Sequence, residues 1–342
     1  MAYDSRGFLE ALVDDGRPLI ILTGLCLGLS GAFALFQSAT GHFLPHDTEY
    51  LQMTPQELCG INECRIVHFM FHDRVSFGGT LIAVAVLYVW LAIFPLKAGD
   101  AWSWWALCFS GLLGFGSFLT YLGYGYLDTW HGAATLALLP NFIAGLWKSR
   151  GLIVSKTVAD ERDDSWRSLL RPSPRIVWRS RAGVGCLCLL LTAMGMIGAG
   201  LTIQVVGMTS VFVPTDLTFI ALNREQLIAI NPRLVPLIAH DRAGFGGGVA
   251  TAGFLLFACV WCGGPSRSLW QALLFGGIAG WSTAIGVHPL IGYNDAGHLA
   301  PAVTGALLFF AGMALAWPSN RSDIQKGLYG LGPTATTATA DA

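Results

Sequence analysis

Charged side chains are scarce in this sequence. Only 12% of the 342 residues are charged and 54% are hydrophobic, whereas a soluble domain carries about 25% charged residues. This scarcity excludes an ordinary soluble globular protein. The alternation of apolar and polar residues that marks outer-membrane strands is also missing. The sequence therefore predicts an all-α integral membrane protein whose main partner is the lipid bilayer, and no nucleic-acid partner is expected.

Eight apolar runs are long enough to cross a bilayer, whose hydrocarbon core of about 30 Å needs about 20 apolar residues per helix. We expect transmembrane helices at residues 18–38, 67–95, 103–124, 129–147, 182–208, 239–262, 269–288 and 298–317. The N-terminal segment lacks the basic region of a secretory signal, so the first run is expected to remain as a membrane helix.

Lysine and arginine are nearly absent from two long loops. Loop 39–66 has one arginine and loop 209–238 has two, whereas the linker 148–181 is rich in both residue types. Positively charged loops stay on the cytoplasmic side of a membrane. We therefore expect a multi-pass protein of the cytoplasmic (inner) membrane, with both termini in the cytoplasm and the two long loops outside.

The sequence contains the same unit twice. "HDRVSFGG" at 72–79 returns as "HDRAGFGG" at 240–247, and "GYLDTWH" at 125–131 returns as "GYNDAGH" at 292–298. Each unit holds four of the expected spans, an even number, so both copies enter the membrane in the same direction. This pattern predicts two four-helix bundles related by a pseudo-two-fold axis along the membrane normal.

The expected domain organisation follows from the spans and the repeat. A polar N-terminus precedes the first repeat, the basic linker separates the two repeats, and a low-complexity tail follows the second. These parts cover residues 1–17, 18–147 with outer loop 39–66, 148–181, 182–317 with outer loop 209–238, and 318–342. The composition of the tail is typical of disordered segments.

Two histidines are kept in each copy: His72 and His131 in the first, and His240 and His298 in the second. In each copy the pair opens the second and the fourth span from outside, at similar depth. Imidazoles on facing helices of a bundle suit the axial ligation of heme iron. We predict a b-type heme between His72 and His131 and another between His240 and His298, one or two per chain.

Charged residues flank these histidines. An arginine two residues after the first histidine of each copy suits a heme propionate, because a guanidinium binds carboxylates bidentately. Neighbouring aspartates suit the ligand N–H groups. The candidates are Arg74, Arg242, Asp73, Asp128, Asp241 and Asp295. The glycines of "FGG" allow close approach of a macrocycle or a helix. The histidines without a histidine partner in the other copy are His42, His46, His68 and His288.

Cysteines occur in one outer loop and not in the other. Cys59 and Cys64 lie in loop 39–66, and in an oxidising compartment they form a small disulfide. The alternative is a redox-active dithiol. The other six cysteines lie in or near apolar runs, where we expect small packing side chains.

The combination of eight spans in two similar halves, two outer histidines per half and a cysteine pair in the first outer loop resembles heme A synthase. The resemblance covers about residues 18–317. It implies a substrate heme at the histidines of the first half and a cofactor heme at those of the second. It also implies a disulfide between Cys59 and Cys64.

One motif departs from that family. The family has a glutamate three residues before its first histidine and an arginine directly after it. This sequence has Phe69 at the glutamate position, and Asp73 separates His72 from Arg74. The resemblance therefore implies heme binding and electron transfer more than it implies oxidation of a heme methyl group.

These patterns favour electron transfer, or the oxidation of heme or quinone, with a quinone, a heme or a redox protein as partner on the outer side. Loops 39–66 and 209–238 are expected to fold over the sites as lids. Two other classes of function stay open: a transporter gated by the His-Asp-Arg clusters, and a cofactor-free structural or assembly subunit. A metal ion at His68 and His72 is a further alternative.

Overall fold

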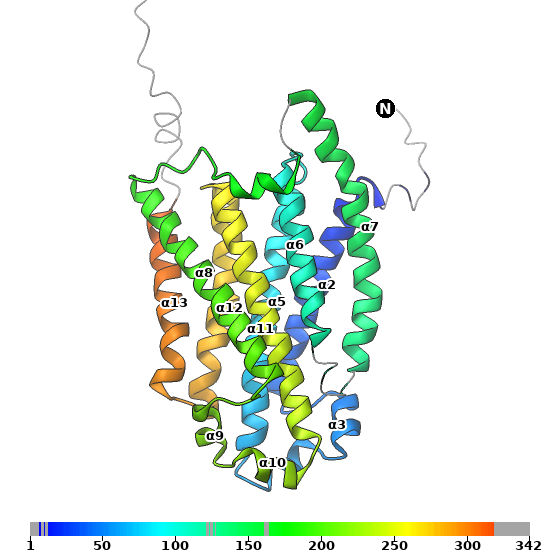
Figure 1. Cartoon of the computed structure of the whole chain (residues 1–342), viewed down its shortest axis with the longest axis vertical. Helices are drawn as coiled ribbons and strands as arrows, with labels where there is room; N and C mark the ends of the chain where they lie inside the picture. The colour runs from blue at the N-terminus through cyan, green and yellow to red at the C-terminus, as the bar shows by residue number, and fades with distance from the viewer. Residues whose placement is uncertain are drawn as a thin grey trace, which may run out of the picture.

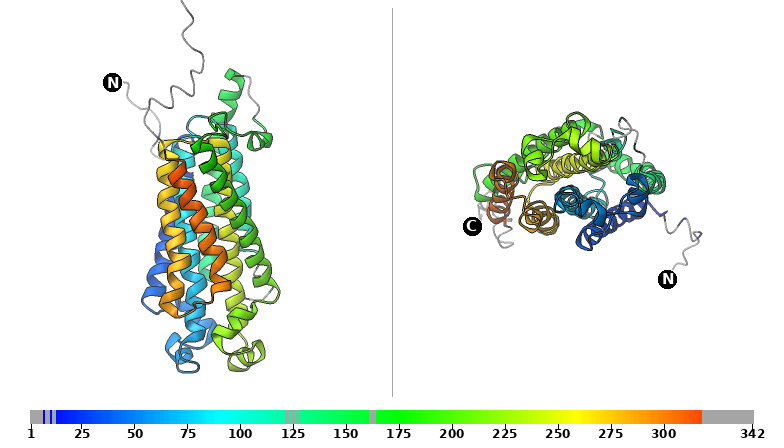
Figure 2. Two further views of the ribbon diagram at one scale, coloured as in Figure 1. Left: turned by 90° about the vertical axis from the view of Figure 1, so that its left-hand side faces the viewer. Right: turned by 90° about the horizontal axis from the view of Figure 1, so that it is seen from below.

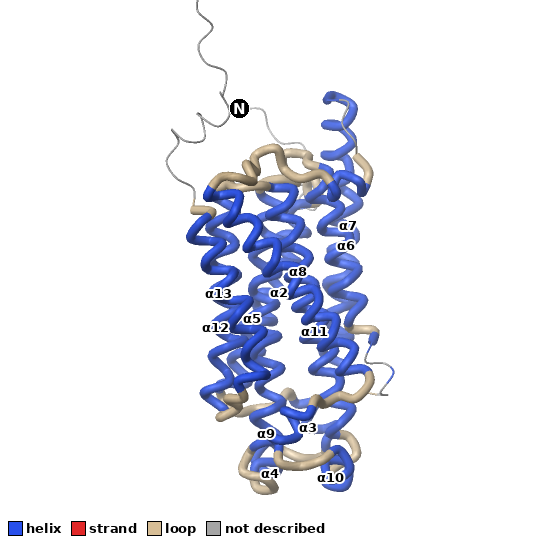
Figure 3. The backbone as a smooth tube through the Cα atoms, turned by 60° about the vertical axis from the view of Figure 1, so that its left-hand side comes forward, coloured by secondary structure: helices blue, strands red, loops and turns tan. Residues whose placement is uncertain are grey.

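The computed structural model is built from long helices that run lengthwise and are joined at two ends (Figures 1 and 3). It describes residues 13–317 apart from 121, 122, 124, 125, 127 and 161–163, together with residues 7 and 10. Within this part no strand occurs, so the all-α prediction is confirmed. The long helices are α2 (Arg17–Ala39), α5 (Arg65–Ile93), α6 (Ala101–Ser117), α7 (Thr129–Asp160), α8 (Arg181–Met208), α11 (Leu234–Ala258), α12 (Arg267–Ile291) and α13 (Ala296–Leu315).

Six helices of the described part are long and apolar enough to cross a membrane: α2, α5, α8, α11 with the π-helical turn Cys259–Gly263 that extends it, α12 and α13. Each coincides with a predicted span to within a few residues. The predicted spans 103–124 and 129–147 fall on α6 and α7, which are not among the six. α6 ends at Ser117, and α7 continues through Lys148 and Arg150 into the polar linker. The expected tail, 318–342, lies outside the described residues.

The helices of the two halves are interleaved. α5 packs against α2 of its own half and against α12 of the other, and α11 packs against α8 of its own half and against α6 of the other. α5 and α11 also contact each other. The two expected four-helix bundles are therefore packed closely together, since the second helix of each half contacts helices of both halves.

The "FGG" glycines account for this packing on α5. Gly78 lies against Gly31 of α2, and Gly79 lies against Thr283 of α12. A Cβ atom at either glycine would clash with the facing helix. The motif thus lets α5 approach one helix from each half, as small residues do in membrane helix packing.

α11 repeats the arrangement with the second "FGG". Gly246 lies against Gly200 of α8, and Gly247 lies against Ser117 of α6. Again the first glycine contacts the same half and the second contacts the other half. The repeated glycine pair therefore serves close helix contact, one of its two expected uses.

Short helices cover one end of the molecule (Figures 1 and 2). They are α3 (Pro45–Leu51) and α4 (Pro55–Cys59) in the first long loop, and α9 (Pro214–Ile220) and α10 (Arg224–Ile230) in the second. The linker, with the 3₁₀-helix η2 (Trp166–Leu170), lies at the opposite end, where α2 begins and α13 ends. A disulfide joins Cys59 and Cys64 as predicted.

The two long loops hold each other in place. Nδ2 of Asn62 donates to the carbonyl oxygen of Ile220 at 3.0 Å, and Nδ2 of Asn231 donates to that of Leu51 at 2.7 Å. Beneath them, the loops and the first turns of α5 and α11 bury a shared apolar core that includes Leu58 and Leu227, the latter at an equivalent position of the repeat. The loops therefore form one cap over the ends of both central helices.

Candidate functional site

Each His-Asp-Arg triplet contributes to two different sites. Successive residues of an α-helix point about 100° apart, so the three side chains of a triplet spread over more than half of the helix circumference. On α5, His72 contacts His288 and Asp73 contacts Arg242, whereas Arg74 points to Asp241, next to His240. On α11, His240 contacts His131 and Asp241 contacts Arg74, whereas Arg242 points to Asp73, next to His72. Three adjacent polar residues can therefore serve two sites, because their side chains point in different directions from the helix.

The arginines bind the triplets to each other and to the loops. Nε of Arg74 donates to Oδ2 of Asp241 at 2.8 Å, and its Nη1 lies 3.0 Å from Oδ2 of Asp47 in α3. The equivalent contacts of Arg242 are 3.1 Å to Asp73 and 2.6 Å to Asp216 in α9. Both arginines are thus neutralised by two buried aspartates each, one from a helix and one from a loop.

The first group of possible ligands is the His72 cluster, which consists of His72, His288 and His298. Nε2 of His72 lies 3.1 Å from Nε2 of His288, and the ring centroids of His72 and His298 lie 5.5 Å apart. The three ligand nitrogens all lie within 4.8 Å of one another. His72 and His288 are buried, with 4% and 3% of their surfaces exposed.

The second group is the Asp128 cluster, which consists of Asp128, His131 and His240. Nδ1 of His131 lies 2.7 Å from Oδ2 of Asp128 and 3.2 Å from Nε2 of His240, and the third edge, His240 to Asp128, measures 3.7 Å. Asp128 caps α7, since its Oδ1 accepts from the backbone N–H groups of Trp130 and His131. Aspartate is a preferred residue at this position of a helix.

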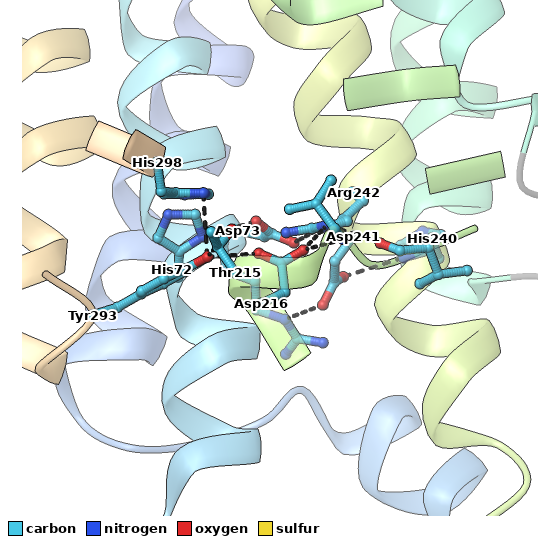
Figure 4. A network of polar contacts seen from close by, with 12 residues as sticks. His72, Asp73, Thr215, Asp216, His240, Asp241, Arg242, Tyr293 and His298 are labelled. Carbon is cyan, nitrogen blue, oxygen red and sulfur yellow. Dashed lines mark hydrogen bonds and ion pairs between the residues drawn. The ribbon is translucent and has the colours of Figure 1, made fainter. Parts of the chain in front are cut away.

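Tyrosines and a loop histidine complete the surroundings. The hydroxyl of Tyr126 donates to Asp47 at 2.6 Å, and that of Tyr293 donates to Asp216 at 2.8 Å and lies 3.2 Å from Nδ1 of His298 (Figure 4). Burial raises the pKa of both tyrosines, so both hydroxyls remain protonated donors. They connect the loop aspartates to the helices.

The carboxylate of Asp128 is held in its charged form. Burial by itself raises its pKa, but contacts with His131 and His46 outweigh burial and bring the pKa well below the ordinary value. Nε2 of His46 lies 2.9 Å from Oδ1 of Asp128. Burial lowers the pKa of His46, yet Asp128 and Asp47 raise it above the usual value. The Asp128 cluster therefore presents a carboxylate ligand that is supported by the imidazole of His46.

The predicted histidine pairs differ from those in the structure. The structure places His72 with His298, and His131 with His240, so each group joins one histidine from each half. The predicted pairs were His72 with His131 and His240 with His298, whereas the contacts between the halves bring together one histidine from each half. Asp295 is also placed differently from Asp128: it caps α13 by accepting from the N–H of His298 and is exposed.

Several site residues were not predicted. Asp47, Asp216, Tyr126 and Tyr293 occupy equivalent positions in the two copies, and this repetition was the signal that identifies them. His288 was set aside because it has no counterpart histidine, and the residue aligned with it, position 121, lies outside the described residues.

A heme does not fit between His131 and His240, or between His72 and His298, with the side chains as they lie. An imidazole nitrogen binds a metal at about 2.0–2.1 Å, so two axial ligands stand about 4 Å apart. Nδ1 of His131 and Nε2 of His240 lie only 3.2 Å apart, and His288 fills the space beside His72. The arginines expected at the propionates are already paired. These spacings suit a small ion bound on one side.

An apolar cavity lies beside the Asp128 cluster and is lined by α2, α5, α6 and α11. Its volume of about 40 Å³ has room for about three water molecules. Phe118 belongs to its wall and stacks on His131, with ring centroids 5.4 Å apart. Gly244, another wall residue, lies one helical turn from His240. The cavity thus approaches the cluster from the apolar interior of the helices.

Comparison with known proteins gives no relative: no family model, no curated protein and no solved structure matches this chain. The residues themselves carry the functional inference. They offer three groups of possible ligands at the loop-covered end of the helices: the His72 cluster without a carboxylate, the Asp128 cluster with one, and a third group of His46, Asp47 and Asp128 that shares Asp128 with the second.

Proposed function

We propose that this chain is a membrane metalloprotein in which Asp128, His131 and His240 bind one divalent transition-metal ion. By its donor set the ion is ferrous iron. Two histidines and one carboxylate on one face of the metal, with the remaining positions open, are typical of non-heme Fe(II) sites. The centre would work in electron transfer or oxidation at the outer end of the spans.

The triangle of ligand atoms carries this proposal. Ligands bound at about 2.0–2.1 Å and at right angles to one another stand about 3 Å apart. The three edges of the Asp128 cluster, 2.7, 3.2 and 3.7 Å, surround that value. No rearrangement of helices is needed to place an ion above this face.

Outer contacts hold the ligands in the required orientation. Nδ1 of His240 lies 3.2 Å from Oδ1 of Asp241, which leaves Nε2 directed at the cluster. Oδ1 of Asp128 contacts His46, which leaves Oδ2 for the ion. Such carboxylate–histidine contacts are the usual support of a metal site. Here they come from α11 and from the first outer loop.

The membrane placement completes the proposal. α6 and α7 would cross the bilayer with the six candidate spans, giving eight spans in two parallel repeats. The concentration of Lys and Arg in the linker favours a cytoplasmic linker and cytoplasmic termini. Both clusters then lie near the outer face of the inner membrane, under the cap formed by the two loops.

The cavity favours an apolar reaction partner. Its lining is apolar and it meets the cluster at Phe118, from the side of the spans. A quinone dissolves in the membrane and matches this apolar lining better than a polar solute does, but its ring is larger than the cavity of about 40 Å³, so the walls would have to move apart to admit it. A redox protein on the outer side would instead meet the cap.

Metal analysis of the purified protein tests the proposal. Protein made in iron-supplied cells and purified in detergent should contain one iron atom per chain, measured by inductively coupled plasma mass spectrometry. His131→Ala and Asp128→Asn should remove it. His42→Ala is the matched control, because His42 is exposed and lies outside both clusters.

Two results would contradict the assignment. One is a wild-type protein that binds no iron even after anaerobic incubation with Fe²⁺. The other is a pyridine hemochrome spectrum that accounts for all the iron, since the Asp128 cluster would then have opened around a heme.

A further inference from the structure

We infer that the His72 cluster is a second metal centre of a different class, a trihistidine site for copper or zinc. It is separate from the Asp128 cluster: no ligand is shared, and the ligands come from α5, α12 and α13 instead of α7 and α11. It therefore goes beyond the function proposed above and does not depend on it.

The contact between His72 and His288 is the first observation. Their Nε2 atoms lie 3.1 Å apart and the rings meet edge to face, with centroids at 4.5 Å. Ligands around a tetrahedral ion, bound at about 2.0–2.1 Å, stand about 3.3 Å apart. Both rings thus direct a nitrogen at one point, and the ring of His298 lies 5.3 Å from that of His288.

The outward nitrogens of the cluster are the second observation. Nδ1 of His72 lies 2.9 Å from Oδ1 of Asp73, and Nδ1 of His298 lies 3.2 Å from the hydroxyl of Tyr293 (Figure 4). Both contacts leave Nε2 free for a ligand role. Metal-binding histidines are oriented in this way by their second ring nitrogen.

The chemistry of the donors sets the class of ion. All three ligand atoms are imidazole nitrogens, and two neighbouring carboxylates, Asp73 and Asp216, are paired with Arg242. Imidazole suits copper and zinc, and among divalent ions Cu²⁺ binds such sites most tightly. Calcium and magnesium, which need oxygen ligands, are excluded. Three histidines also leave a fourth position open, as catalytic zinc sites do.

The two halves have therefore diverged around a common frame. The equivalents of His72 and His298 are His240 and His131, which belong to the Asp128 cluster. His288 adds a third imidazole to one site, whereas Asp128 adds a carboxylate to the other. Asp295, the equivalent of Asp128, is exposed and accepts a hydrogen bond from the backbone N–H of His298 in α13.

A copper titration tests this inference. The full-length protein in detergent is stripped with a chelator, loaded with Fe²⁺, and titrated with Cu²⁺ under electron paramagnetic resonance. We expect one Cu²⁺ per chain with nitrogen hyperfine structure from three imidazoles, apart from any Cu²⁺ that displaces Fe²⁺ from the Asp128 cluster. His298→Ala and His288→Tyr, the latter introducing the residue aligned at position 121, should each abolish that signal. Zn²⁺ added first should block it.

Matched variants separate this site from the first. His131→Ala should lose iron and keep the copper signal, and His42→Ala should keep both. Each variant is accepted only if it elutes as a single species with the Cys59–Cys64 disulfide intact. The inference is overturned if the wild type binds no Cu²⁺, or if folded His298→Ala and His288→Tyr bind it as well as the wild type does.

Discussion

Nε of Arg74 on α5 donates to Oδ2 of Asp241 on α11 at 2.8 Å, and Nε of Arg242 donates to Asp73 at 3.1 Å in the reverse direction. Each triplet thus supplies the arginine for the aspartate of the other. The two central helices are joined by a reciprocal pair of buried ion pairs at the level of both clusters. This exchange explains why the triplet is needed twice.

Removal of one arginine should therefore be costly. Arg74→Leu leaves Asp241 and Asp47 buried without their cation, and breaking a buried ion pair in this way costs about 3–5 kcal/mol. We expect a large drop in thermal stability in detergent, measured by fluorescence of a thiol-independent dye. Arg65→Leu is the control, since Arg65 is 42% exposed and pairs with Glu63; it should change stability by about 1 kcal/mol or less. Equal effects of the two variants would contradict the reciprocal pairing.

The helix contact at the second "FGG" predicts opposite effects on stability for two glycine-to-alanine substitutions. A Cβ at Gly246 meets the backbone of Gly200 on α8, whereas a Cβ at Gly198 on the same helix meets nothing within 4 Å. Gly246→Ala should destabilise the protein by about 1–3 kcal/mol through overpacking. Gly198→Ala should stabilise it by up to about 1 kcal/mol through helix propensity. Thermal unfolding of both variants gives the comparison.

The sequence was informative wherever one segment determines its own structure. The predicted span 182–208 is α8 to within one residue, and the predicted span 269–288 lies inside α12, because apolar length alone sets a membrane helix. The disulfide followed from two cysteines five residues apart in one loop. The triplets were recognised because both copies keep them.

The sequence was less informative about which helices meet. His72 and His131 share a repeat, yet His72 meets His288 and His298. α5 packs against α12, which carries His288, and α12 packs against α13, which carries His298. The hydropathy of a helix describes one helix at a time and does not encode that choice. The local feature closest to an indication of the helix partner was Gly79, whose missing side chain leaves space for Thr283 of α12. His288 was not selected as a ligand because the selection relied on residues kept in both copies, and the first copy has no histidine at the position equivalent to His288.

The loop disulfide should matter for stability and not for metal binding. Cys59 and Cys64 lie in α4 and just before α5, outside both clusters. Closing so short a loop removes chain entropy worth about 2 kcal/mol. The double variant Cys59→Ser, Cys64→Ser should melt earlier by a corresponding amount and keep the iron and copper content of the wild type. A loss of either metal in the folded variant would instead indicate a redox role for the pair.

The loop aspartates should control one cluster each, and the interleaving decides which. Asp216 contacts Tyr293 and Arg242, and Tyr293 orients His298. Asp216→Asn should therefore weaken Cu²⁺ binding at the His72 cluster by about 10–100-fold, the usual effect of losing an outer contact of a metal ligand. Iron at the Asp128 cluster should stay bound.

Asp47→Asn should do the opposite, because Asp47 contacts Tyr126 and His46, and His46 supports Asp128. Iron affinity should fall by a similar factor while the copper signal persists. Competition titrations of both variants against a chelator of known affinity give the two factors side by side. If each variant weakened both metals equally, the loops would act through general destabilisation of the cap. The crossed pattern instead requires that each loop aspartate reach a separate centre through its own tyrosine or histidine.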